Sequence, residues 1–305
     1  MNKIRSFFNQ NRKKILIAII FIVFFIIIIQ VLDKRAERKI NERNIYSNSK
    51  SESKSNKSVI SDSEISESAY KFQKSIVSDF VEYCNKGEIE KAYELISTDC
   101  KEELYPTVGD FKKYYYDNIF TCKRTFSMQN WNGLIYIVRY TEDVLSTGRI
   151  NDESTIQDYV TIVFENEKAK LNINSYLGRT EINKENSQQD VKIKVLEKRS
   201  YMNYEIYDFE VENNTGYTII LDTLSNNTMY LTDQNRVNHY SINNEISKES
   251  LVIKNKYKSK ISIKFDNPYI VDRKIKTVTF NNIGVCYENN SIGAYKEIIK
   301  FNVNI

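Results

Sequence analysis

The sequence predicts an α+β domain of three helices on a curved antiparallel sheet, followed by an all-β sandwich and preceded by an N-terminal transmembrane helix. Three observations support this prediction. An uncharged apolar run occupies residues 15–32. Apolar residues recur every three or four positions up to Phe120 and every second position after it, which marks a change from helices to strands. After Val191 no helical stripe appears, and short alternating segments follow one another to the C-terminus.

The run at residues 15–32 has the length of a membrane-spanning helix. It contains one polar side chain, Gln30, and as a helix it extends about 27 Å, close to the hydrocarbon thickness of a bilayer. A cleavable leader has a shorter apolar core, followed by small residues at the cleavage site, and this run has neither feature. We therefore expect an uncleaved signal anchor that crosses the cell membrane once.

The flanks of this run set its expected orientation. Residues 1–14 form a basic arm without an acidic side chain, too short to be a domain, so we expect a cytoplasmic N-terminus and extracytoplasmic C-terminal domains. Lys and Arg are equally numerous on both sides, and their count alone gives no direction. Residues 33–61 form a charged stalk and a Ser-rich linker with almost nothing to bury, which indicates a tether.

Composition excludes several classes of function. The 305 residues are 41% hydrophobic and 28% charged, as in folded domains, and a net charge of +4 provides no basic field for nucleic acid. His239 is the only histidine, lies in a polar segment and is expected at the surface. A His-based zinc site, a Ser-His-Asp triad or a Cys-His pair would have to depend on this one residue. The cysteines have no metal-ligand spacing, and a bridge between Cys100 and Cys122 stays open. We expect no cofactor and no metal.

Residues 62–178 are predicted to form the α+β domain, which opens with a long helix. Ser61 and Glu64 have the spacing of a capping box at the helix N-terminus, and Gly87 is placed to end the helix. Between them, apolar residues recur along one helix face: Ile65, Ala69, Phe72, Ile76, Phe80 and Cys84.

Two shorter helices and a run of strands follow. The helices are expected at residues 88–97 and 105–120, the second opened by the capping pair Thr107 and Asp110. A tight turn, "ENEK", joins the last two strands. The expected strands are at residues 121–131, 134–140, 158–164 and 168–174. Helices followed by an antiparallel meander are typical of an α+β domain.

This part of the chain resembles the nuclear-transport-factor-two-like superfamily of cone-shaped α+β domains. The resemblance covers residues 62–178 and rests on the order of the elements and on the helix "GEIEKAYELIS". It implies either a small-molecule enzyme or a non-enzymatic module of a single-span bacterial protein, such as a conjugation or secretion assembly factor. Enzymes of the superfamily use a carboxylate or a His–Asp pair inside the cone, and this domain has no histidine.

A cone of this kind has a mouth that aromatic and basic side chains can line. The candidates for such a pocket are Trp131, Tyr136, Arg139, Tyr140 and Tyr159. Asp143 and Asp158 could supply a carboxylate, but both flank strands beside polar loops, where carboxylates are usually solvated. Tyr-rich strands are more often ordinary sheet packing than binding sites. We therefore expect no catalytic residues and a protein that is not an enzyme.

Residues 179–190 are polar and are expected to form a linker, and residues 191–305 are expected to form the β-sandwich. Seven or eight short strands alternate there with clusters of Asn, Asp, Ser and Gly. The segments "FEVENNT" and "LVIKNKYKSKISIKF" resemble immunoglobulin-like domains of bacterial cell-surface proteins. This resemblance implies an architecture without an activity.

Four lysines of this second domain alternate with uncharged residues: Lys254, Lys256, Lys258 and Lys260. In an extended segment they share one face. One interpretation is an edge strand that its lysines protect from pairing with other chains, and the other is a contact surface for an anionic polymer or lipid headgroups. The small net charge favours the first interpretation.

Two Pro, eight Gly and an abundance of Asn, Lys, Ile and Tyr are typical of an AT-rich, Gram-positive-type genome. The leading hypothesis is a membrane-anchored, extracytoplasmic interaction or scaffold protein of such a cell envelope, in a conjugation- or secretion-type complex. Its expected partners are the membrane and other envelope proteins. One alternative is a small-ligand-binding protein or enzyme that uses the cone pocket, and another is a binder of anionic envelope polymer. An open pocket with a buried carboxylate favours the first alternative, whereas a cone filled with Tyr and Phe side chains argues against it.

Overall fold

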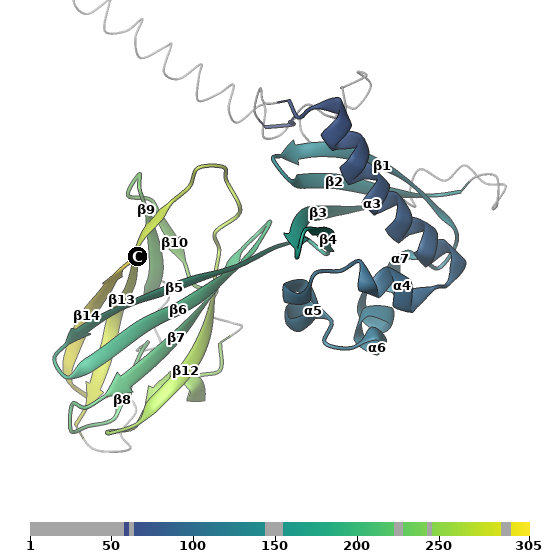
Figure 1. Ribbon diagram of the computed structural model, residues 1–305. Helices are drawn as coiled ribbons and strands as arrows, with labels where there is room; N and C mark the ends of the chain where they lie inside the picture. The colour runs from purple at the N-terminus through teal and green to yellow at the C-terminus, as the bar shows by residue number, and fades with distance from the viewer. Residues whose placement is uncertain (1–57, 61–63, 144–154, 223–227, 243–245, 288–293) are drawn as a thin grey trace, which may run out of the picture. The chain divides into compact units, whose positions relative to one another are not determined.

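The computed structural model describes residues 58–60, 64–143, 155–222, 228–242, 246–287 and 294–305 (Figure 1). These residues belong to one compact unit, Lys54–Ile305. The predicted arm, the predicted membrane span and most of the predicted tether lie outside the described residues. Within the described ranges, no helix has the length and apolar character needed to cross a membrane.

The first long element is helix α3 (Glu67–Lys86). Its N-cap is Ser66, whose hydroxyl accepts a hydrogen bond from the Ala69 N–H at 3.2 Å, so the helix begins later than the expected capping box at Ser61. The predicted end at Gly87 is confirmed, because Gly87 has a φ of 72° and donates its N–H to the last turn.

The buried face of α3 differs from the predicted stripe at one position. Phe72 is 54% exposed, whereas Tyr70 and Gln73 face the interior. The Tyr70 hydroxyl donates to the backbone carbonyl of Met128, and the Gln73 side chain accepts a hydrogen bond from Tyr136. These contacts with the sheet turn the helix so that Phe72 lies on its outer side.

Four short helices and one π-helical turn follow α3. Thr107 and Asp110 form the predicted capping box, and Phe111, Tyr115 and Ile119 are buried as predicted. Helix α5 was not expected, because its sequence, "TDCKEEL", has a single buried residue, Cys100. The elements are α4 (Ile89–Glu94), α5 (Thr98–Leu104), α6 (Val108–Phe111), η1 (Lys112–Tyr116) and α7 (Asp117–Ile119).

An antiparallel sheet with the order β1-β2-β3-β4 completes the part that we call the α+β lobe, residues 58–174. Its strands are β1 (Arg124–Asn132), β2 (Ile135–Glu142), β3 (Ile156–Glu165) and β4 (Lys168–Asn172), which confirms the four predicted strands. The predicted tight turn is present, with positive φ angles at Asn166 and Glu167. Figure 1 shows α3 on one face of this sheet.

The remaining strands form the part that we call the β lobe, residues 176–305, which begins with the sheet order β12-β7-β6-β5. Its strands are β5 (Tyr176–Gln188), β6 (Val191–Tyr201), β7 (Glu205–Asn213) and β12 (Lys258–Phe265). The expected linker at residues 179–190 is therefore mainly strand β5. Most of β5 is exposed because it is an edge strand, so its composition resembles a linker, and its pairing with β6 makes it a strand.

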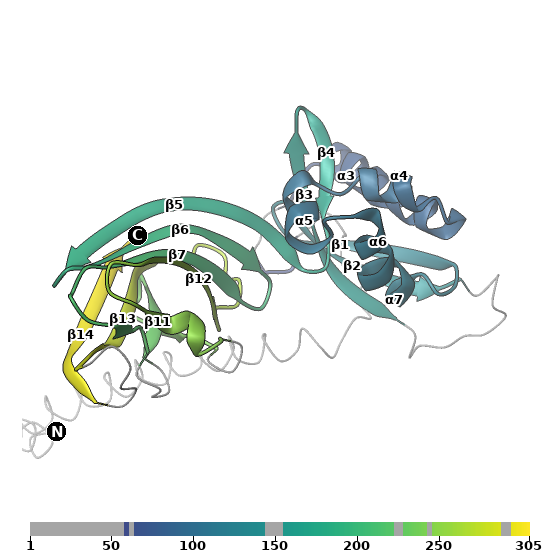
Figure 2. The same ribbon diagram turned by 90° about the horizontal axis from the view of Figure 1, so that it is seen from below.

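A second antiparallel sheet of six strands faces the first sheet. Its order is β10-β9-β13-β8-β11, with β14 also paired to β13. Its strands are β8 (Ile219–Ile220), β9 (Met229–Asp233), β10 (Asn238–Tyr240), β11 (Val252–Ile253), β13 (Ile275–Cys286) and β14 (Tyr295–Asn304). Figure 2 shows the two layers of strands. They enclose one apolar core, in which the rings of Phe209 and Phe280 meet edge to face with their centroids 5.3 Å apart. The described chain is thus sheet-rich, with antiparallel sheets.

Candidate functional site

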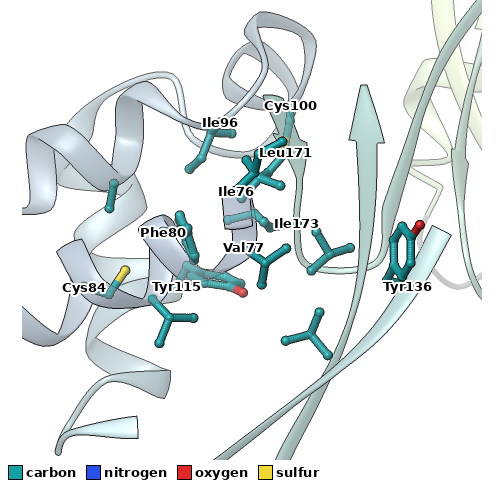
Figure 3. Close-up of a cluster of buried hydrophobic side chains, with 14 of the residues drawn as sticks. Ile76, Val77, Phe80, Cys84, Ile96, Cys100, Tyr115, Tyr136, Leu171 and Ile173 are labelled. Atoms are coloured by element: carbon teal, nitrogen blue, oxygen red, sulfur yellow. The ribbon is translucent and has the colours of Figure 1, made fainter. Parts of the chain in front are cut away.

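The interior of the α+β lobe is filled by its own side chains. Figure 3 shows Val77 and Phe80 of α3 and Tyr115 of η1 close to Ile173. The Phe80 ring lies 6.1 Å from Phe111 and 6.2 Å from Tyr115. Aromatic rings therefore occupy the space that an open cone would leave for a ligand, which is the arrangement that argues against a cone pocket.

A carboxylate, Asp158 of β3, is buried in this interior and only 5% exposed. Its Oδ2 accepts hydrogen bonds from the Tyr115 hydroxyl and the Asn174 N–H, both at 2.8 Å, and its Oδ1 accepts one from the Ser175 N–H at 2.9 Å. The Tyr115 hydroxyl lies 3.2 Å from that of Tyr140. Burial raises the pKa of Asp158 to about 6, although these hydrogen bonds act in the opposite direction.

The sequence-based expectation that Asp158 is solvated was wrong. Asn174 and Ser175 have positive φ angles of 58° and 62°, and this turn brings their N–H groups onto the carboxylate. Donors from the chain itself engage both oxygens of Asp158, and these hydrogen bonds hold the connection between β4 and β5.

The five predicted pocket residues lie on two opposite faces of the sheet. Tyr136 and Tyr140 belong to the core beneath the helices. Trp131 and Tyr159 meet edge to face at 5.5 Å on the other face, and the alternation of β2 places Arg139 there as well. The five side chains therefore do not line one pocket. The aromatic residues predicted the strands correctly. The face of the sheet on which each side chain lies depends on the pairing register of the strands, and composition does not show that register.

The end of the predicted tether lies along the edge of β1. The Ser58 hydroxyl donates to the Trp131 carbonyl at 2.6 Å, and the Val59 N–H donates to the Asn130 carbonyl at 3.0 Å. Ser58 is buried by this contact. Ser58 and Val59 thus attach this end of the tether to the edge of β1.

The lysines of the predicted strip are divided between a turn and a strand. Lys254 and Lys256 lie in the turn before β12, where Lys256 has a φ of 62°, and Lys258 and Lys260 lie on β12. β12 is the edge strand of its sheet, and Lys258 pairs with Glu210 of the neighbouring strand at 2.7 Å. This pairing favours the interpretation of a protected edge strand.

Glu103 of α5 is the centre of a set of ion pairs with the β lobe. Its two carboxylate oxygens lie 3.0 and 3.1 Å from Arg199 Nη1, and Oε1 accepts a hydrogen bond from the Tyr201 hydroxyl at 2.7 Å. Arg199 also reaches Asp208 of β7 at 2.6 Å. One arginine thereby connects a helix of the α+β lobe to two strands of the β lobe.

Asp99, one turn earlier on α5, makes a second connection. Its Oδ1 lies 3.0 Å from Arg179 Nε, and its Oδ2 accepts hydrogen bonds from the Tyr176 hydroxyl and the Arg179 N–H. Arg179 also lies 3.3 Å from Glu197. We call these two connections, centred on Asp99 and Glu103, the α5 ion-pair cluster. They fix α5 against β5 and β6.

The single histidine is buried, and the four cysteines are unbridged. His239 is 8% exposed, with Nε2 3.4 Å from Asp233 Oδ2, so the expectation of a surface histidine was wrong: His239 is the central residue of β10, and strand alternation points it inward between two exposed neighbours. All four cysteines are free thiols, so Cys100 and Cys122 form no bridge. Burial raises the pKa of the Cys84 and Cys100 thiols. In the described part of the chain, no three His, Cys, Asp or Glu residues are grouped to hold a metal.

Comparisons of the chain with protein-family models, with curated proteins and with solved structures find no match. The grounds for proposing a function are therefore the sequence pattern and the contacts described above. Those contacts, the hydrogen bonds to Asp158 and the α5 ion-pair cluster, connect separate elements of the folded unit.

Proposed function

We propose that this protein is a membrane-anchored, extracytoplasmic interaction protein of a cell-envelope complex, of the conjugation or secretion type. The observation that carries the proposal is the apolar run at residues 15–32, with its basic arm before it and its Ser-rich tether after it. An anchor of this kind keeps the folded unit at the membrane surface, and the tether lets it reach partners there.

Contacts of the folded unit support a scaffold more than a ligand-binding cone. Tyr and Phe side chains fill the α+β lobe, and Asp158 is engaged by groups of the chain itself. The α5 ion-pair cluster joins the two lobes, and Ser58 attaches the end of the tether to β1. A partner bound by either lobe is then held by the same anchor.

We assign the α+β lobe to the nuclear-transport-factor-two-like superfamily and the β lobe to immunoglobulin-like domains as part of this proposal. The order of helices followed by an antiparallel meander supports the first assignment, and two facing antiparallel sheets support the second. Both assignments concern architecture, and the function depends on the surfaces that each lobe presents.

Photo-cross-linking in intact cells tests the proposal. A photoreactive amino acid at Phe72, on the outer side of α3, or at Tyr257, in the turn before β12, probes one exposed position in each lobe. We expect adducts with other envelope proteins, and we expect them to be lost when a cleavable leader replaces residues 1–32. The control is the same residue at buried Phe280. Adducts with cytoplasmic proteins alone would contradict the proposal.

A further inference from the structure

A cavity of about 310 Å³ lies where the ends of β5, β6 and β7 meet the segment between β12 and β13. Ile135 of β2 and Thr161 of β3 complete its lining. Nothing in the sequence pattern marked this site, because its residues come from six separate segments of the chain. Its size is at the lower end of the range for small-molecule pockets, about 300–1,000 Å³.

The carboxylate of this cavity, Glu205, is paired with one lysine and hydrogen-bonded by two neutral side chains. Its Oε1 accepts a hydrogen bond from Lys198 Nζ at 2.7 Å, and its Oε2 accepts hydrogen bonds from Asn267 Nδ2 at 2.6 Å and from the Tyr207 hydroxyl at 3.0 Å. Glu205 therefore fixes Lys198 and Asn267 in place and offers little unshared charge to a ligand.

The cationic groups of the cavity retain donors that can bind a ligand. Arg273 Nη1 donates to Asn267 Oδ1 at 2.6 Å and to the Pro268 carbonyl at 3.0 Å, and Nε lies 3.9 Å from Asp233 Oδ2. Nη2 makes no hydrogen bond within the described part of the chain and is the donor left for a ligand. Lys198 uses one of its three N–H groups on Glu205. Arg179 also lines the cavity, but its guanidinium is already paired with Asp99, Glu103 and Glu197, so Arg273 and Lys198 are the cations that retain donors.

Apolar side chains form the rest of the wall. Leu177, Ile270 and Ile275 line the cavity beside Arg273, and Ile270 is 50% exposed. A large aliphatic side chain exposed next to a guanidinium fork suits a ligand with one anionic end and one apolar part.

We propose that this cavity binds a small organic anion, with its carboxylate or phosphate oxygens at Arg273 and Lys198 and its apolar part against Leu177, Ile270 and Ile275. The argument depends on charge and shape at this cavity alone, so the site is independent of the anchor and of the interaction function proposed above. The filled core of the α+β lobe is not involved.

Calorimetric titration of the full-length protein in detergent micelles tests the proposal, with empty micelles as the blank. The probes are 3-phenylpropanoate and phenyl phosphate, and the matched neutral probe is 3-phenylpropanamide. We expect at least one anion to bind at least about tenfold more tightly than the amide. Equal affinities for the amide and both anions, or no binding of either anion up to about 10 mM, would overturn the proposal.

Variants at the cavity locate the binding. Arg273→Gln removes the fork, and we expect it to weaken anion binding by about tenfold or more. Lys192→Gln is the matched control, because Lys192 lies on the same strand as Lys198, makes one ion pair with Glu185 and is outside the cavity.

A second pair of variants leaves Arg273 in place, and with it the hydrogen bonds that Arg273 makes to Asn267 and Pro268. Ile270→Asp and Ile270→Lys change the charge at an exposed position of the rim. We expect the aspartate to weaken anion binding and the lysine to strengthen it. Anion affinities that stay the same in both Ile270 variants place the binding elsewhere and overturn the proposal.

Discussion

Asp158 is a carboxylate whose pKa rises on folding, from about 3.8 to about 6, because it becomes buried. A group of this kind stabilises the fold fully below its unfolded pKa, and this contribution is lost as the pH rises through the folded pKa. Relative to Asp158→Asn, we therefore expect the free energy of unfolding of the wild type to fall by about 3 kcal/mol between about pH 3.5 and pH 7. Urea unfolding followed by the fluorescence of Trp131, the single tryptophan, measures this difference.

The control for Asp158 is Asp233, whose pKa changes in the opposite direction. Burial alone would raise the pKa of Asp233, but the N–H groups of Val237 and Asn235, together with the His239 side chain, outweigh burial and lower it. The contribution of Asp233 is thus lost as the pH falls below its unfolded pKa of about 3.9, the reverse of the trend for Asp158. A difference between wild type and Asp158→Asn that stays constant with pH would contradict the assignment of a raised pKa.

Thr161 and Thr279 are both buried strand threonines, but their hydroxyl groups differ. Thr161 Oγ1 has no hydrogen-bond partner among the described residues, whereas Thr279 Oγ1 donates to Asn302 Oδ1 at 2.8 Å. Valine has the same shape without the hydroxyl, so we expect Thr161→Val to raise the free energy of unfolding by about 1 kcal/mol and Thr279→Val to lower it by about 1 kcal/mol. Equal losses of stability in the two variants would show that Thr161 Oγ1 has a partner.

At the scale of elements, β12 is an edge strand with lysines on its exposed face. Replacing Lys258 and Lys260 with threonine keeps the strand propensity and removes the charges that oppose pairing with another chain. We expect the sedimentation coefficient of the double variant to rise with protein concentration, because the chains self-associate. The Lys192→Thr variant, on the interior strand β6, should show no such rise. Salt-sensitive binding of an anionic polymer by the wild type, abolished in Lys258→Glu, would instead support a contact surface.

The elements that could be predicted were those whose ends are marked by a few neighbouring residues in the sequence. The glycine at position 87, the Thr107–Asp110 capping box and the turn at Asn166 and Glu167 each follow from a short stretch of sequence. β5 was not recognised, because an exposed edge strand needs few apolar residues and depends on pairing with β6. The candidate sites were less predictable, since the donors around Asp158 and the lining of the Arg273 cavity come from segments far apart in the chain.

At the scale of the whole molecule, the α5 ion-pair cluster makes the stability of one lobe depend on the other. Glu103→Gln leaves Arg199 without a bidentate carboxylate, and we expect it to lower the free energy of unfolding by about 2 kcal/mol. We also expect the two lobes of this variant to unfold in separate steps. Trp131 fluorescence reports the unfolding of the α+β lobe, and circular dichroism of the strands reports the unfolding of the β lobe as well. Glu185→Gln, which removes an exposed ion pair with Lys192, serves as the control and should change stability by less than about 0.5 kcal/mol. Coincident transitions in Glu103→Gln would show that the cluster does not couple the lobes.

The central claim is that the folded unit lies outside the membrane, held by the run at residues 15–32. Protease added to intact, wall-stripped cells tests it directly, with epitope tags at both ends of the chain. The account predicts that the C-terminal tag is released with a fragment that begins beyond about residue 45, in the proposed tether, while the N-terminal tag stays protected. Protection of the C-terminal tag in intact cells, with digestion only after lysis, would contradict the account.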